Sequence, residues 1–117
     1  METKKATGRQ GWWFAVVDGA ALPCVHKHWL TGLSYHDPFK RHEHKNIGAK
    51  IGEYVDAVAA GRRVILTDDD ATLDSDGEVI AFARSRYIAV FEVDDVTYAA
   101  PDGLRFRLVD RLCHLEP

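Results

Sequence analysis

The sequence predicts an α+β domain built on a small, twisted, mostly antiparallel β-barrel, with a helical segment after the first strand. Three observations support this. WWFAVVDG at residues 12–19 is aromatic and β-branched and ends in an Asp-Gly turn signal. NIGAKIGEYVDAVAAG at residues 46–61 has apolar side chains at helical spacing. From residue 62 onward, β-forming runs alternate with turn signals such as DSDG.

The size and composition predict one domain. A length of 117 residues fits a single core, and we expect a disordered leader over residues 1–10 and one domain over residues 11–117. That domain could be the N-terminal part of a longer protein. Two distant cysteines predict no disulfide framework and fit a reducing cytoplasm. No stretch reaches the roughly 20 apolar residues that cross a bilayer, so we expect a cytoplasmic protein with no membrane partner.

The first half of the chain contains one ambiguous strand and one clear helix. ALPCVHKHWL at residues 21–30, if it is a strand, places Cys24, His26 and His28 on one face. The helix is expected to begin at Asn46 as N-cap and to end before Gly61 as the C′ residue.

The second half is predicted to consist of strands. RRVILTDDD at residues 62–70 is a strand followed by an acidic turn, and EVIAFARSRYIAVFEV at residues 78–93 holds enough β-formers for two strands. LRFRLVDRL at residues 104–112 alternates as a half-buried strand with an arginine-bearing outer face. TDDDATLDSDG at residues 67–77 lacks the spacing of an EF-hand loop, so we expect a solvated hairpin loop, with any nucleic-acid surface on the opposite side.

Charge is distributed unevenly within the net charge of −3. Residues 1–66 hold ten Lys/Arg against six Asp/Glu, whereas residues 67–117 hold five against twelve. Five of the six histidines lie in residues 26–44, among lysines and an arginine. Such a segment can contact phosphates, and histidine adds positive charge beside them. The candidate phosphate-binding residues are Lys27, His28, Lys40, Arg41, His42, His44, Lys45 and Arg62.

The order of these motifs resembles the PUA-like superfamily, most closely its EVE and YTH modules and more distantly SRA domains. The resemblance rests on the aromatic first strand, the helical insertion, AGRRVILT after the helix, the GEVIA strand and the closing LRFRLVDRL. It covers about residues 11–115. The chain departs from the pattern at Arg62, where relatives usually have an aspartate. The resemblance implies a small twisted barrel that binds nucleic acid and often holds one modified base.

In EVE and YTH relatives, aromatic residues around the first strand and the following loop build the base pocket. The positions that could match are Trp12 or Trp13, Trp29 and Tyr35. An extruded base also needs hydrogen bonds to its polar edge. Ser34, Asp37 and Asn46 lie nearby in sequence and could supply them.

We therefore expect a non-catalytic nucleic-acid reader domain that recognises a modified base, in DNA in preference to RNA. The resemblance further implies a modification-dependent restriction system with a fused or partner nuclease. We expect no cofactor. Two other classes stay open. One is a small metal-dependent enzyme using His26, His28 and His36, and the other is a protein-interaction module presenting an exposed tryptophan pair.

Overall fold

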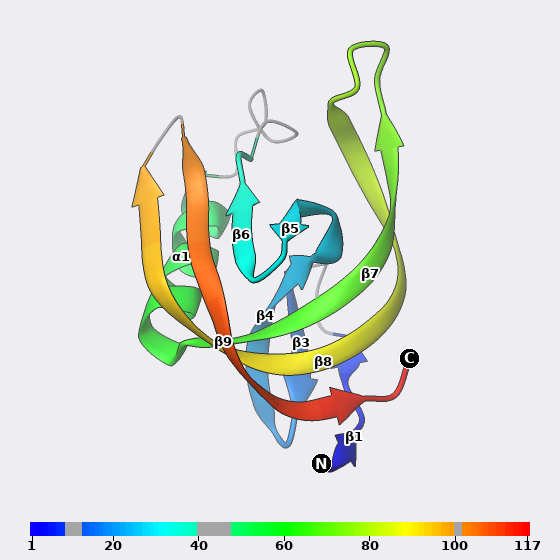
Figure 1. Cartoon of the computed structure of the whole chain (residues 1–117), viewed down its shortest axis with the longest axis vertical. Helices are drawn as coiled ribbons and strands as arrows, with labels where there is room; N and C mark the ends of the chain where they lie inside the picture. The colour runs from blue at the N-terminus through cyan, green and yellow to red at the C-terminus, as the bar shows by residue number, and fades with distance from the viewer. Residues whose placement is uncertain (9–12, 40–47, 100–101) are drawn as a thin grey trace.

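The computed structural model describes residues 1–8, 13–39, 48–99 and 102–117, with the backbone but not the side chains of residues 84 and 85. The chain begins with four strands, three of which are short, and Figure 1 shows their arrangement. They are β1 (Thr3–Lys4), β2 (Thr7–Gly8), β3 (Phe14–Val17) and β4 (Ala20–His26). There follow the 3-10 turn η1 (Lys27–Trp29), β5 (Leu30–Thr31), β6 (Ser34–Asp37), α1 (Gly48–Gly61), β7 (Arg63–Leu73), β8 (Val79–Ala99) and β9 (Gly103–Leu115).

All strands belong to one mixed sheet in the order β2-β3-β4-β7-β8-β9-β6-β5, with β1 on the far end of β9. Among the described strands, only β4–β7 and β1–β9 pair in parallel, and the other neighbours are antiparallel. The predicted α+β class is therefore confirmed. Closure into a barrel is not observed, because the strand path ends at β2 and β5 and no pairing within the described ranges joins them.

The long strands β7 and β8 bend as they cross the molecule (Figure 1). β8 is one strand of 21 residues where the sequence predicted two. Its pairing with β7 shifts register between Leu66 and Thr67 and again between Asp68 and Asp69. Because bulges of this kind bend and twist a strand without ending it, no turn is needed in the middle of β8.

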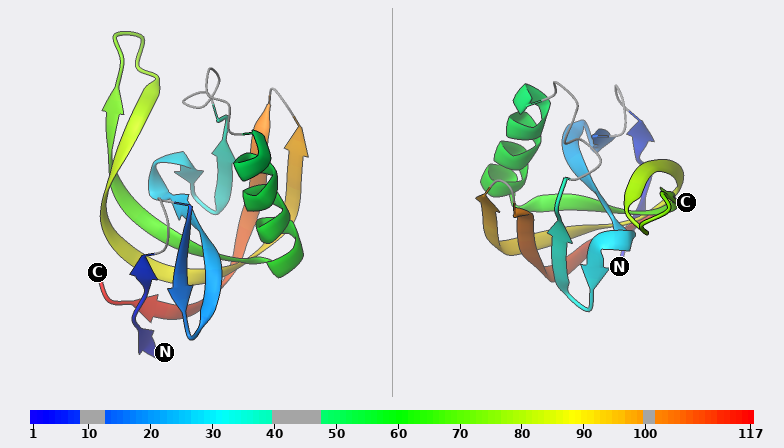
Figure 2. Two further views of the ribbon diagram at one scale, coloured as in Figure 1. Left: turned by 180° about the vertical axis from the view of Figure 1, so that it is seen from behind. Right: turned by 90° about the horizontal axis from the view of Figure 1, so that it is seen from above.

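In the body of the sheet, residues 64–66 of β7 are covered on both faces. Val64 and Leu66 point into a core shared with α1, which contributes Tyr54 and Val58. Ile65, between them in sequence, points to the opposite face and a second core. In a strand, successive side chains alternate between faces, so one run of aliphatic residues serves both cores. Figure 2 shows α1 lying along one side of the sheet.

The helix ends one residue later than expected. Gly61 is the last helical residue, and Arg62 has the left-handed conformation (φ 53°) that the sequence assigned to a glycine. The Arg62 N–H donates to Val58 O at 2.9 Å, and Arg62 O accepts from Val93 N at 2.9 Å. These backbone bonds hold a conformation that non-glycine residues rarely adopt. The predicted N-cap Asn46 lies outside the described residues.

The disordered leader expected over residues 1–10 is contradicted for its described part. β1 pairs in parallel with the end of β9, and β2 pairs with β3. Two further backbone bonds, His114 N to Glu2 O and Glu116 N to Lys4 O, are both 2.9 Å. A strand of two residues is too short to show alternation in the sequence. β1 and β2 are defined only by their pairing with β9 and β3.

The predicted Asp-Gly turn is confirmed at Asp18 and Gly19, whose φ values of 52° and 78° suit a two-residue hairpin. The predicted acidic loop is wrong over most of its length. Residues Thr67 to Leu73 are strand, and the turn begins only at Asp74. The Asp74 carboxylate accepts from the N–H groups of Asp76 and Glu78 and closes that turn.

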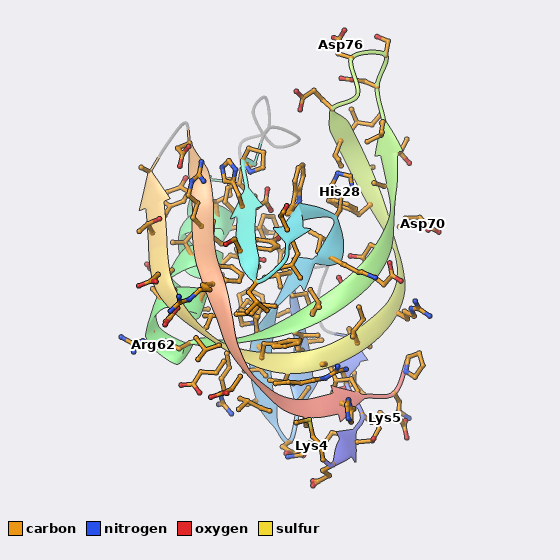
Figure 3. All side chains as sticks on the ribbon, in the orientation of Figure 1. Lys4, Lys5, His28, Arg62, Asp70 and Asp76 are labelled. Atoms are coloured by element: carbon orange, nitrogen blue, oxygen red, sulfur yellow. The ribbon has the colours of Figure 1, made fainter. Side chains whose placement is uncertain are left out.

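Beyond the body of the sheet, β7 and β8 continue as a two-stranded arm, defined here as residues 67–73 and 79–87. β4 pairs with β7 only as far as Thr67, and β9 pairs with β8 only from Ala89. The arm projects past the rest of the molecule and ends in the acidic turn that includes Asp76 (Figures 1 and 3). No helix in the described ranges is long and apolar enough to cross a membrane.

Candidate functional site

The candidate site lies where β4 ends and the arm begins. His26 is the last residue of β4, and its parallel pairing with Thr67 of β7 brings η1 against the arm. The expected strand over residues 21–30 therefore stops at His26, and the backbone turns through Lys27, His28 and Trp29. The two histidines do not share a strand face. They meet instead through a third residue, Phe82 of β8.

A buried polar chain anchors His26. Its Nδ1 lies 2.5 Å from Asp69 Oδ2, and Thr67 Oγ1 donates to the same oxygen at 2.6 Å. The His26 side chain is 9% exposed and the Asp69 side chain only 1%. The sequence placed Asp69 in a solvated loop, and this is wrong. The alternation of Thr67, Asp69 and Ala71 along one strand face was the available signal.

Four rings, those of His26, His28, Trp29 and Phe82, contact one another and are called the aromatic group here. His26 stacks on Phe82 with ring centroids 3.9 Å apart and planes 13° apart. His28 and Trp29 approach Phe82 edge-on, at 5.8 and 6.1 Å, and contact one another at 4.8 Å. The sequence analysis did not select Phe82. Because Phe82 belongs to the arm, the candidate site lies beside the acidic segment, whereas the sequence analysis expected any nucleic-acid surface on the opposite side.

The indole of Trp29 has an unusual feature. Its Nε1 is fully buried and has no hydrogen-bond partner among the residues that the structure describes. A buried donor without an acceptor costs about 1–3 kcal/mol, so such groups normally meet water or a ligand. Trp29 itself is only partly buried, which leaves part of the ring open to solvent.

The other predicted base-pocket residues do not gather here. Tyr35 is 2% exposed and stacks on Phe106 at 4.5 Å, and its hydroxyl accepts from His26 N. Asp37 is 0% exposed and accepts from Phe39 N at 2.9 Å. Trp13 packs edge-on against Tyr54 in the core under α1. Tyr35 and Asp37 are therefore removed from the candidate site because they are buried, and Trp13 is removed because it packs against Tyr54 of α1 and not against the aromatic group.

Of the predicted base-pocket set, Trp29 and Ser34 remain. Ser34 is exposed and follows η1 on the β5–β6 hairpin, where it pairs with Thr31. Trp12 lies outside the described residues, as does Asn46.

The predicted phosphate-binding residues separate into three groups. Lys27 and His28 are exposed on η1 beside Trp29. Arg62 lies at the end of α1, on the opposite side of the molecule from His28 (Figure 3). The remaining predicted residues, Lys40, Arg41, His42, His44 and Lys45, lie outside the described residues. Within the described part, only Lys27 and His28 join the candidate site.

The histidine set proposed for a metal enzyme is not assembled. Tyr35 points toward His26, so its neighbour His36 on β6 points away, because strand side chains alternate. The Nε2 of His36 lies 2.7 Å from Asp102 O, at the opposite edge of β6. Within the described ranges, no three His, Cys, Asp or Glu side chains form a group that could hold a metal ion.

The arginine-bearing face predicted for β9 is present, and Arg105 and Arg107 on it form ion pairs. Arg107 chelates Asp94 with N–O distances of 3.2 and 3.0 Å, and its hydrogen bond holds the pKa of that carboxyl below the ordinary value. Arg105 binds Asp102 in the same way and likewise lowers the pKa of that carboxyl. Because each guanidinium is neutralised locally, this face is a weaker candidate for phosphate contact than η1.

Comparison with protein-family models, curated proteins and solved structures finds no match to this chain. The assignment of a function rests on the geometry of the site and on the chemistry of its residues.

Proposed function

We propose that this chain is a non-catalytic nucleic-acid-binding domain that recognises one modified base, in DNA in preference to RNA, at the site formed by η1 and Phe82. The single observation on which this rests is Trp29. The residue is partly exposed to solvent, while its N–H is buried and has no acceptor among the described residues. A base that stacks on this ring would gain about 1–3 kcal/mol, and the N–H, which lies in the ring plane, would be left as a donor for another acceptor of the bound nucleic acid.

The surroundings of Trp29 suit a nucleic acid better than a neutral ligand. Lys27 lies on the same turn and forms no ion pair with any residue that the structure describes, so its ammonium is available for a phosphate. His28 adds a second ring and a group that can carry positive charge. Phosphate contacts of this type position the chain, and the ring contacts then select the base.

The arm sets the direction of approach. Asp70, Asp74, Asp76 and Glu78 are exposed on it, whereas Asp68 is paired with Arg86 at 2.7 Å. Asp70 and Asp76 lie on its outer side and at its tip in Figure 3. Their charge repels phosphates from the outside of the arm, so a nucleic acid would approach from the side of η1.

We extend the proposal to the wider context that the PUA-like resemblance implies. The open mixed sheet with one helix would be a PUA-like arrangement, acting in the cytoplasm with a fused or partner nuclease in modification-dependent restriction. Asp69 and Phe82 would then be additions of this chain to the base site.

The test is binding to matched duplexes that carry cytosine, 5-methylcytosine, 5-hydroxymethylcytosine, N6-methyladenine or a phosphorothioate linkage, across a salt series. Discrimination that persists as salt rises supports a base site. Salt-sensitive binding without discrimination reduces the function to phosphate contact. The absence of binding at low salt contradicts the proposed function.

Two substitutions locate the site. Trp29→Ala should lower affinity for the preferred duplex by about tenfold or more, in line with the loss of one stacked base. Leu33→Ala, an exposed apolar truncation on the neighbouring β5–β6 turn, is its control and should leave binding unchanged. Lys27→Ala should reduce the salt slope by about one contact, whereas Lys5→Ala, at the opposite end of the molecule from the arm tip, should not (Figure 3).

A further inference from the structure

The contact with Asp69 determines which nitrogen of the His26 ring carries the proton. A carboxylate can only accept hydrogen bonds. Because Asp69 Oδ2 lies 2.5 Å from His26 Nδ1, the proton of that contact belongs to the ring nitrogen. Thr67 donates to the same oxygen at 2.6 Å and holds the carboxylate in place. In an uncharged imidazole with the proton on Nδ1, the other nitrogen, Nε2, carries a lone pair and is an acceptor.

The rest of the ring is held rigidly and its second nitrogen is unused. Stacking on Phe82 at 3.9 Å fixes the plane of the imidazole. The backbone N–H of His26 donates to the Tyr35 hydroxyl at 3.2 Å, which fixes the start of the side chain. Nε2 makes no hydrogen bond to any group in the part of the chain that the structure describes. The nearly buried His26 ring is thus held in place by three contacts, and its Nε2 acceptor is unpaired within the described residues.

This acceptor lies in the same aromatic group as the buried donor of Trp29. Both rings contact Phe82, one by stacking and the other edge-on at 6.1 Å. The site therefore offers one hydrogen-bond acceptor and one donor around a shared aromatic ring. The edge of a nucleobase likewise presents both donors and acceptors.

We propose that His26 reads the polar edge of the base bound beside Trp29 by accepting a hydrogen bond from an N–H group of the base at Nε2. Asp69 is the positioning residue that sets this polarity. This inference rests on the proposed function and specifies its selectivity. The preferred base is one that keeps an N–H donor on the recognised edge, such as the exocyclic amino group of an adenine or cytosine derivative.

The first experiment needs no nucleic acid. Nitrogen NMR of the histidine rings at about pH 8.5, above the ordinary histidine pKa of about 6.5, should show His26 with the proton on Nδ1 and a bare Nε2. Asp69→Asn should move the proton to Nε2, because the amide can donate to Nδ1. Asp70→Asn, the same change on the next residue with its side chain exposed, should leave the tautomer as in the wild type. A protonated Nε2 in the wild-type chain overturns the inference.

The second experiment compares the modified duplex that the wild-type chain prefers with a match in which a carbonyl replaces the exocyclic amino group of the recognised base and the opposite base is changed to keep the pair. Asp69→Asn and His26→Gln should each reduce the ratio of the two affinities by about tenfold, the effect of one lost hydrogen bond to a base. Asp70→Asn should keep the ratio within about twofold. A merely structural role of Asp69 would weaken both duplexes equally and leave the ratio unchanged, which overturns the inference. Thermal unfolding of each variant shows whether the chain still folds, and Asp69→Asn retains the shape of the side chain.

The outcomes separate this inference from the function beneath it. A preference for the amino base over the carbonyl base that survives in both variants overturns the role of His26 and leaves the proposed reader function standing. Wild-type binding without discrimination contradicts the reader function and the reading role together, whatever the tautomer.

Discussion

The same two strands, β7 and β8, run through two regions that are stabilised in different ways. In the body, Val64, Leu66 and Ile65 are buried on alternate faces against two apolar cores. In the arm, Leu73 and Ile80 are half exposed, Asp69 and Phe82 contact His26 at the end of β4, and Phe82 also contacts His28 and Trp29 of η1. The body is held by apolar burial, and the arm by a few polar and aromatic contacts.

This difference has a consequence for function. An isolated two-stranded ribbon is marginally stable in water. The arm therefore depends on its contacts with η1 for its position, and the candidate binding residues sit at that junction. Regions of low local stability are where ligand-binding elements are commonly found.

The largest expected effect comes from the same substitution, isoleucine to alanine, made once in the body and once in the arm. Ile65→Ala, at a position 0% exposed in the body, should lower the free energy of unfolding by about 3 kcal/mol. Ile80→Ala, at a position 50% exposed in the arm, should change it by less than about 0.5 kcal/mol. Denaturant unfolding measures both. Similar losses at the two positions would show that the arm shares the body's stability.

The next effect tests whether the aromatic group holds the arm. Phe82→Ala removes the ring that contacts His26, His28 and Trp29. Amides of the arm should then exchange with solvent about tenfold faster, corresponding to about 1.4 kcal/mol of local stability. Amides of the body should keep most of their protection. Tyr98→Ala, at the other end of β8, is the aromatic control and should leave arm exchange unchanged. Equal acceleration in body and arm would contradict a separate arm.

A smaller effect concerns the helix that covers the body. Gly52 is a solvent-exposed residue in the middle of α1, and an added Cβ would meet nothing within 4 Å. Gly52→Ala should raise the free energy of unfolding by about 0.5–1 kcal/mol, because alanine loses less backbone entropy in a helix. Gly48→Ala, at the first helical residue, should do less. Arm exchange should not change in either variant, since α1 packs on the body.

The smallest effect is electrostatic and lies at the surface of the body. Arg107 lowers the pKa of Asp94 from its ordinary 3.8, so their pairing stabilises the folded chain above that pH and is lost as pH falls through the lower, folded value. Arg107→Ala should raise the pKa of Asp94 toward 3.8, and carboxyl NMR titration measures it. Arg111→Ala, on the same strand but over Phe91, is the control. An unchanged Asp94 titration in Arg107→Ala would contradict the pairing.

Sequence patterns predicted the elements whose signals are local. The helix, the Asp-Gly hairpin and the alternation of Leu104, Phe106 and Leu108 against exposed arginines all appear where they were expected. Lys27, His28 and Trp29, which the sequence analysis named as candidate binding residues, lie together on η1. Local patterns could not show that Tyr35 and Asp37 are buried. Their exposure depends on β9 and on the backbone around Phe39, which are set by long-range pairing.

The sequence by itself determined the class of the fold, the Asp-Gly hairpin turn and the basic character of the segment around η1. These follow from side-chain periodicity and backbone preference, which act over a few residues. Only the tertiary structure decided that Asp69 and Phe82 meet His26, because 43 residues separate His26 from Asp69 in the chain. That meeting depends on the parallel pairing of β4 with β7 and on the bulges of the arm, which no local pattern specifies.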